Sequence, residues 1–108
     1  MDIRRVTASL SALATPSRLE VLRVLAQAGS EGMPSGDIAK ALDVPQNTLS
    51  TQLSILASAQ LVESHRQGRF IIYRVDADAL RELVEFMTSE LGAGGKGKGG
   101  KSPRRAAA

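Results

Sequence analysis

The segment VPQNTLSTQLSIL, residues 44–56, carries amide and hydroxyl side chains at helical spacing and contains no charged residue. If Leu49, Leu53 and Leu56 face a core at positions i, i+4 and i+7, the polar groups lie on the opposite face of the helix. Amides can bond bidentately to adenine and hydroxyls can bond to several bases, so this face is suited to reading base edges in the major groove of DNA. The candidate base-reading residues are Gln46, Asn47, Ser50 and Thr51, with Thr48 and Gln52 at the edges of the face.

The composition of this helix favours a contact surface over an ordinary solvated one. An exposed helix usually carries Glu and Lys, which are good helix formers, whereas residues 46–54 use Asn, Ser and Thr, which are poor ones. A short helical pattern precedes the segment and a hairpin pattern follows it, which also favours DNA binding. The competing interpretation is a polar face that only contacts water.

Attraction to DNA must come from other residues, because neutralisation of phosphates supplies most nonspecific binding. The hairpin pattern after this helix is basic, since it carries one acid, Glu63, against several cations that include Arg74. We expect His65, Arg66 and Arg69 to contact phosphates or the minor groove, and we favour that role for His65 over a pH sensor. Further candidate cations on helices are Arg4, Arg5, Arg18 and Lys40.

Apolar residues at helical spacing predict two helices before the polar segment. The dipeptide Thr15-Pro16 is typical of an N-cap and first helical position, and Gly29 suits the C-terminal end of the same helix. The first helix has a stripe made of Ile3, Val6, Leu10 and Leu13, and the second is expected to bury Leu19, Leu22 and Leu25.

Residues 30–34 are predicted as a loop, and a short third helix capped by Ser35 follows. After Ala59 the periodicity changes, and residues 61–75 predict two β-strands joined by a tight turn at Gly68. A last helix then begins at Asp76 or Asp78. The order helix, helix, helix, helix, hairpin, helix predicts an α+β fold that is mainly α, a winged helix-turn-helix.

The charge divides the chain into two parts. The whole chain has a net charge of +3, but residues 1–91 contain nine basic and eleven acidic side chains. Residues 92–108 contain five basic side chains, six glycines and no acid. We therefore expect one DNA-binding and dimerisation domain over 1–91 and a disordered basic tail over 92–108. The tail either adds a diffuse attraction to DNA or is an inert extension.

Composition excludes several classes of function. The sequence has no cysteine and one histidine, so thiolate metal sites, thiol redox switches and cysteine nucleophiles are excluded. No catalytic constellation and no cofactor motif is present, which indicates that the protein is not an enzyme. No stretch approaches the roughly 18 apolar residues of a membrane span, and no secretory signal pattern is present. We expect a cytoplasmic protein without a membrane partner.

The chain resembles the ArsR/SmtB family of bacterial winged helix-turn-helix repressors from about Leu10 to Leu91. The segments that carry the resemblance are LATPSRLEVLRVL, SGDIAKALDVPQNTLSTQLSIL, AQLVESHRQGRFIIYRV and the last helix. The resemblance implies a homodimer joined through its first and last helices. It also implies repression through an imperfect inverted repeat in promoter DNA.

Members of that family are usually released from DNA by a metal or metalloid ion, and this chain departs from each of their sensor patterns. The helix before the base-reading helix lacks the family's cysteine pair, and the last helix lacks its histidines. The arsenite-responsive branch, which the chain resembles most, has a Cys-Cys pair where Leu91 and Gly92 stand here. We therefore predict no metal site, and the alternative is a site made only of carboxylates on the dimerising helices. The inducer stays open between a small molecule, a partner protein and none.

An apolar stripe on the last helix is broader than a small domain can bury alone, and we expect it to pack against a second copy. The alternatives are packing within a monomer and, for the whole domain, a winged helix used for protein–protein contact. The residues expected at the dimer interface are Ile3, Val6, Leu10, Leu80, Leu83, Val84, Met87 and Leu91.

Overall fold

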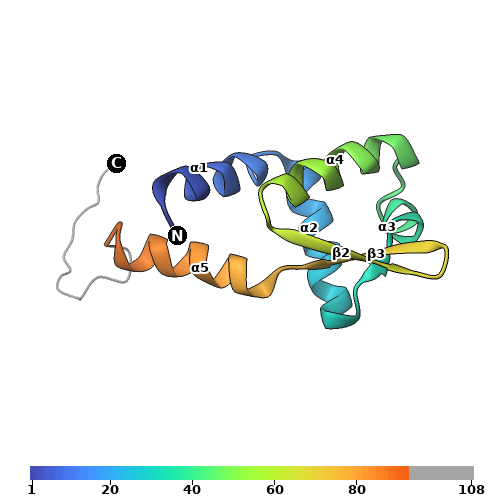
Figure 1. The fold of residues 1–108 in the computed structure, drawn as a ribbon. Helices are drawn as coiled ribbons and strands as arrows, with labels where there is room; N and C mark the ends of the chain where they lie inside the picture. The colour runs from blue at the N-terminus through green and yellow to red at the C-terminus, as the bar shows by residue number, and fades with distance from the viewer. Residues whose placement is uncertain (93–108) are drawn as a thin grey trace.

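The computed structural model describes residues 1–92, so the predicted tail lies outside the described residues except for Gly92. It is a winged helix-turn-helix, as predicted (Figure 1). The elements in chain order are α1 (Ile3–Ala12), α2 (Pro16–Ala28), the 3-10 helix η1 (Gly29–Glu31), β1 (Met33–Pro34), α3 (Ser35–Leu42), α4 (Gln46–Ser58), β2 (Val62–Gln67), β3 (Phe70–Val75) and α5 (Ala77–Ser89).

Side-chain caps fix the starts of two of these helices where the sequence predicts them. The Thr15 hydroxyl accepts a hydrogen bond from the Arg18 amide at 3.3 Å, and Asp76 accepts one from the Ala79 amide at 3.1 Å. The predicted cap at Ser35 is wrong. Ser35 is the first residue of α3, and that helix has no side-chain cap.

The sheet has three antiparallel strands in the order β1-β3-β2, where the sequence predicts only a hairpin. The predicted loop contains β1, in which Met33 pairs with Tyr73 and Pro34 with Ile72. Gly32 makes this pairing possible, because a Cβ there would lie 2.5 Å from the Tyr73 carbonyl oxygen. The predicted turn at Gly68 is confirmed, with a φ of 65°.

The core lies between α2, α3, α4 and the base of the sheet. Leu49, Leu53 and Leu56 are at most 1% exposed, which confirms the predicted inward face of α4. The prediction for Leu19 is wrong, since its side chain is 52% exposed. Arg18 is instead the residue that shares a helical stripe with Leu22 and Leu25, at positions i, i+4 and i+7.

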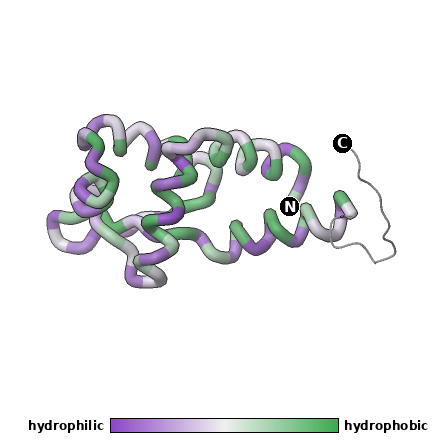
Figure 2. Tube along the Cα trace, turned by 180° about the vertical axis from the view of Figure 1, so that it is seen from behind, coloured by the Kyte–Doolittle hydropathy of each residue, from purple (hydrophilic) through white to green (hydrophobic). Residues whose placement is uncertain are grey.

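The two ends of the molecule are built from different elements. Helices α1 and α5 lie side by side at one end, and α3, the start of α4 and the hairpin tip lie at the other (Figure 1). Apolar and polar residues alternate along α1 and α5 (Figure 2).

Of the helices that the structure describes, none has the length and hydropathy needed to cross a membrane.

Candidate nucleic-acid interface

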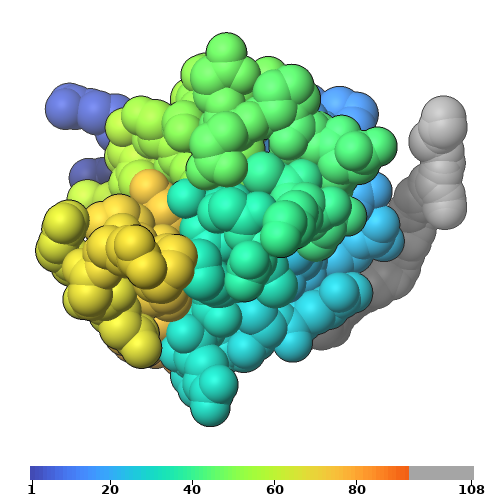
Figure 3. Space-filling model, turned by 90° about the vertical axis from the view of Figure 1, so that its right-hand side faces the viewer, coloured from blue at the N-terminus to red at the C-terminus, as the bar shows by residue number. Residues whose placement is uncertain are grey.

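One surface of the molecule combines the start of α4 with the tip of the hairpin. In the space-filling view of this end, the α4 start (green) and the hairpin tip (yellow) flank α3 (Figure 3). We call the exposed polar residues within 46–51 of α4 the reading face and the exposed residues 65–70 the wing tip. The reading face consists of Gln46, Asn47, Thr48, Ser50 and Thr51, all of them exposed.

The reading face is anchored to α3 at its first residue. The Gln46 side-chain nitrogen Nε2 donates to the hydroxyl of Ser35, the first residue of α3, at 3.1 Å. Asp43 adopts a left-handed conformation in the turn between α3 and α4, with a φ of 55°. On the next turn of α4, the Thr51 hydroxyl donates to the Asn47 carbonyl at 3.3 Å. The first of these bonds joins the first residue of α4 to the first residue of α3.

The structure does not bring Gln52 to the reading face with the other predicted residues. Its side chain is half-buried, and its amide oxygen accepts a hydrogen bond from Arg18 at 3.2 Å. The next residue, Leu53, is buried in the core, so Gln52 lies at the edge of the side of α4 that packs against α2. The structure therefore gives Gln52 a partner within the protein, which the prediction that it reads bases did not include.

The N-terminus of α4 can attract an anion although the helix carries no charged side chain. The helix follows Pro45, has no side-chain cap and carries no acidic residue in its first turn. Its first amide groups and the positive end of its dipole are therefore open toward an anion such as a DNA phosphate. The cation Lys40 lies close by, because it lines the same surface hollow as Gln46.

The wing tip contains three of the predicted contacts, His65, Arg66 and Arg69, and all three are exposed. It also holds Phe70, which sequence reasoning missed. The Phe70 side chain is 54% exposed, and the Arg69 guanidinium lies 5.9 Å from the centre of its ring. The signal that could have identified it is an aromatic residue directly after the turn arginine Arg69.

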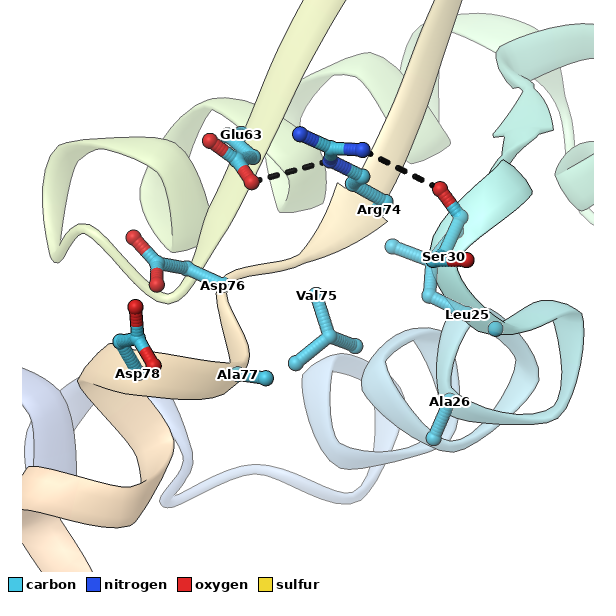
Figure 4. A pocket seen from close by; sticks show the side chains of 10 residues that line it. Leu25, Ala26, Ser30, Glu63, Arg74, Val75, Asp76, Ala77 and Asp78 are labelled. Atoms are coloured by element: carbon cyan, nitrogen blue, oxygen red, sulfur yellow. Dashed lines mark hydrogen bonds and ion pairs between the residues drawn. The ribbon is translucent and has the colours of Figure 1, made fainter.

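Arg74 does not belong to the wing tip, which corrects its inclusion among the wing cations. Its guanidinium donates to Glu63 at 2.9 Å and to the Ser30 carbonyl at 3.2 Å (Figure 4). The charge is thus paired at the base of the hairpin. Arg74 and Glu63 also line a hollow of about 410 Å³ together with Asp76 and Asp78.

Within residues 1–92, no three His, Cys, Asp or Glu side chains are grouped to hold a metal ion.

Two of the further candidate cations have protein partners. Arg5 forms an ion pair with Glu82 at 3.0 Å, which joins α1 to α5. Arg18 donates from Nε to the Ala12 carbonyl at 2.7 Å, in addition to its bond to Gln52. Arg4 is exposed, as is Lys40. Of the candidate cations at this end, Lys40 is exposed beside the reading face, and Arg66 and Arg69 are exposed in the wing tip.

The α1 and α5 end presents exposed apolar side chains, which we call the α1–α5 face. Two of the residues predicted at a dimer interface, Val6 and Leu83, are only 5% and 3% exposed, because α1 and α5 bury them within the chain. They can support an interface from beneath but contribute little area to it. Leu80 is half-buried against the core, and Leu91 lies beyond the end of α5. The α1–α5 face consists of Ile3, Leu10, Val84, Met87 and Leu91.

Known proteins share this sequence pattern and architecture. A family model described as a helix-turn-helix domain matches residues 13–65. Transcriptional repressor SdpR of Bacillus subtilis (strain 168) is 30% identical over 83 residues, which cover 77% of this chain and 89% of SdpR.

Two solved structures have the same fold. An ArsR-like transcriptional regulator from Rhodococcus sp. RHA1 superposes with a TM-score of 0.73 at 26% identity, covering 84% of this chain and 82% of that one. The homodimeric winged helix-turn-helix DNA-binding domain of Mb0332 from Mycobacterium bovis, a possible ArsR-family regulator, gives 0.67 at 31% identity. The match covers 82% of this chain and 80% of that one.

Proposed function

This chain belongs to the ArsR/SmtB family and is a DNA-binding transcriptional regulator, and from that premise we propose that it acts as a dimeric repressor on an inverted-repeat operator in promoter DNA. Its relative SdpR is named a transcriptional repressor, and the Mb0332 domain is described as homodimeric. Both descriptions support the proposal for this chain.

The observation that carries the proposal is the pairing of an uncharged reading face with a cationic wing tip on one surface. Asn47 and Ser50 offer hydrogen bonds that distinguish bases, each good contact contributing about 1–3 kcal/mol of discrimination. Arg66 and Arg69 offer positive charge that any DNA sequence attracts equally. Specificity and attraction are thus assigned to different elements, α4 and the hairpin.

The dimer is supported by the α1–α5 face. Ile3, Val84 and Leu91 are 67%, 54% and 64% exposed, although all three are large and apolar. A second copy would cover them with the same surface of its own, giving a two-fold interface. A two-fold dimer carries two reading faces, which matches an operator made of two inverted half-sites.

The test is fluorescence anisotropy with labelled duplexes from the promoter of its own gene and with scrambled duplexes of equal length. We expect tighter binding to the promoter duplex, and binding to both that weakens as salt is raised. Equal and weak binding to every duplex at all salt concentrations would contradict the proposed function. That result would instead favour a winged helix used for protein–protein contact.

A further inference from the structure

One arginine side chain connects three helices that are separate in the sequence. Arg18 lies in the first turn of α2, and its Nε donates to the carbonyl of Ala12, the last residue of α1, at 2.7 Å. Its Nη1 donates to the amide oxygen of Gln52 in α4 at 3.2 Å. The side chain is half-buried between these partners. Arg18 therefore joins a helix of the α1–α5 face to the helix that carries the reading face.

The end of α1 explains why an arginine is needed at this position. The last carbonyls of a helix lack partners within the helix, and they form the negative end of its dipole. No basic residue occurs in the last turn of α1. Arg18 supplies both a donor and a positive charge to that end. Its planar guanidinium leaves a second, fixed set of donors for Gln52.

We propose that Arg18 is a positioning residue that sets the direction of α4 relative to α1, and thereby the half-site spacing that the dimer accepts. This inference rests on the proposed function. Helix α1 contacts both α4 and α5, so it is the element between the α1–α5 face and the reading face. In a two-fold dimer, the angle between α1 and α4 sets the separation of the two reading faces. That separation must match half-sites about one helical turn of DNA apart, roughly 34 Å.

A direct phosphate contact is the competing role for Arg18, since a cation near a DNA-binding helix can serve as one. Both of the hydrogen bonds that the structure gives the Arg18 side chain are to acceptors within the protein. The variant Arg18→Lys distinguishes the phosphate-contact role from the positioning role. Lysine keeps the positive charge, but it lacks the planar guanidinium whose donors bond to Ala12 and Gln52 together. A phosphate contact tolerates Arg18→Lys, whereas a positioning contact does not.

The experiment uses the full chain and the promoter segment that the wild type protects from nuclease. Anisotropy compares Arg18→Lys with the wild type on this operator, on a duplex with one half-site, and on operators with one base pair added to or removed from the spacer. We expect unchanged half-site binding, about three- to tenfold weaker binding to the operator and a reduced preference for its native spacing. The salt dependence of half-site binding should stay the same.

Matched variants isolate the contact from general effects on folding. Gln52→Ala removes the other partner without changing charge, and should reproduce the pattern of Arg18→Lys. The double variant should lose little more than either single variant, because both remove one interaction. Arg23→Lys is the control, since Arg23 lies on the same helix but is exposed and pairs only with Glu20 in the structure. It should leave all affinities unchanged.

Two results would overturn the inference. Equal loss on the half-site and the operator would mean that Arg18 and Gln52 affect recognition or folding and do not set spacing. Unchanged spacing preference in both Arg18→Lys and Gln52→Ala would mean that the contact has no positioning role. Either result leaves the proposed function intact. That function fails only if the wild type itself does not distinguish promoter DNA from scrambled DNA.

Discussion

Arg74 and Glu63 face each other across β3 and β2, with the guanidinium Nε 2.9 Å from a carboxylate oxygen. The same guanidinium donates to the Ser30 carbonyl, 44 positions away in the sequence. This network separates the hairpin arginines into two groups. Arg74 stabilises the base of the hairpin, and Arg66 and Arg69 are left exposed at the wing tip.

Arg69→Ala should weaken binding to every DNA sequence and make the salt dependence of the dimer shallower by about two units of slope, about one for each protomer. The reason is the loss of one cation from the exposed wing tip of each protomer. Anisotropy titrations from low to high salt measure both effects. The matched control is Arg74→Ala, which should keep the salt slope and lower the free energy of unfolding by roughly 0.2–1 kcal/mol. An unchanged slope in Arg69→Ala would remove Arg69 from the DNA contacts.

Ser50→Ala should reduce discrimination between operator variants at particular base pairs by about 1–3 kcal/mol, with the salt slope unchanged. The hydroxyl lies on the reading face, where a lost hydrogen bond affects sequence preference and not charge. Binding to a panel of single-base operator variants measures the effect. Ser58→Ala, at the far end of the same helix, is the control and should bind the panel as the wild type does. A uniform loss over the panel would contradict base reading by Ser50.

Val84→Asp should convert the dimer to a monomer and abolish tight operator binding. Its side chain is 54% exposed on the α1–α5 face, and burying an unpaired carboxylate in an interface is strongly unfavourable. Sedimentation velocity at micromolar concentration reports the mass. Leu19→Glu is the control, because Leu19 is also exposed, at 52%, but lies on α2 outside this face. Loss of the dimer in both variants, or in neither, would contradict the assigned interface.

Arsenite, cadmium and thiol oxidants should not release the protein from its operator. The chain contains no cysteine, so the thiolate ligands that these reagents need are absent. The measurement is anisotropy of the preformed complex during titration with each reagent. A mild chelator treatment beforehand removes adventitious metal. Release by micromolar arsenite would show that another donor set senses it.

Local sequence signals determined the elements and the face of α4. The spacing of Leu49, Leu53 and Leu56 fixes which side of the helix is buried, because a helix repeats every 3.6 residues whatever it packs against. The caps at Thr15 and Asp76 and the turn at Gly68 are likewise short-range, since each depends on neighbours a few positions away.

Errors arose where the outcome depended on residues distant in the sequence. The strand β1 has only two residues, too few for an alternating pattern, and forms because β3 is beside it. Val6 was predicted at an interface but is buried, because α5 lies against α1. Periodicity predicts that such a residue is covered without specifying whether its own chain or a second copy covers it.

The sequence by itself therefore determined a winged helix-turn-helix with an uncharged reading face and a basic hairpin. Only the tertiary structure decided which of its polar and charged groups have partners on distant parts of the chain. Arg74 is paired with Glu63, and Gln52 is held by Arg18, 34 positions away. The physical reason is that a charged or polar side chain is satisfied by whatever group the fold brings within about 3 Å, and spacing along one helix does not identify that group.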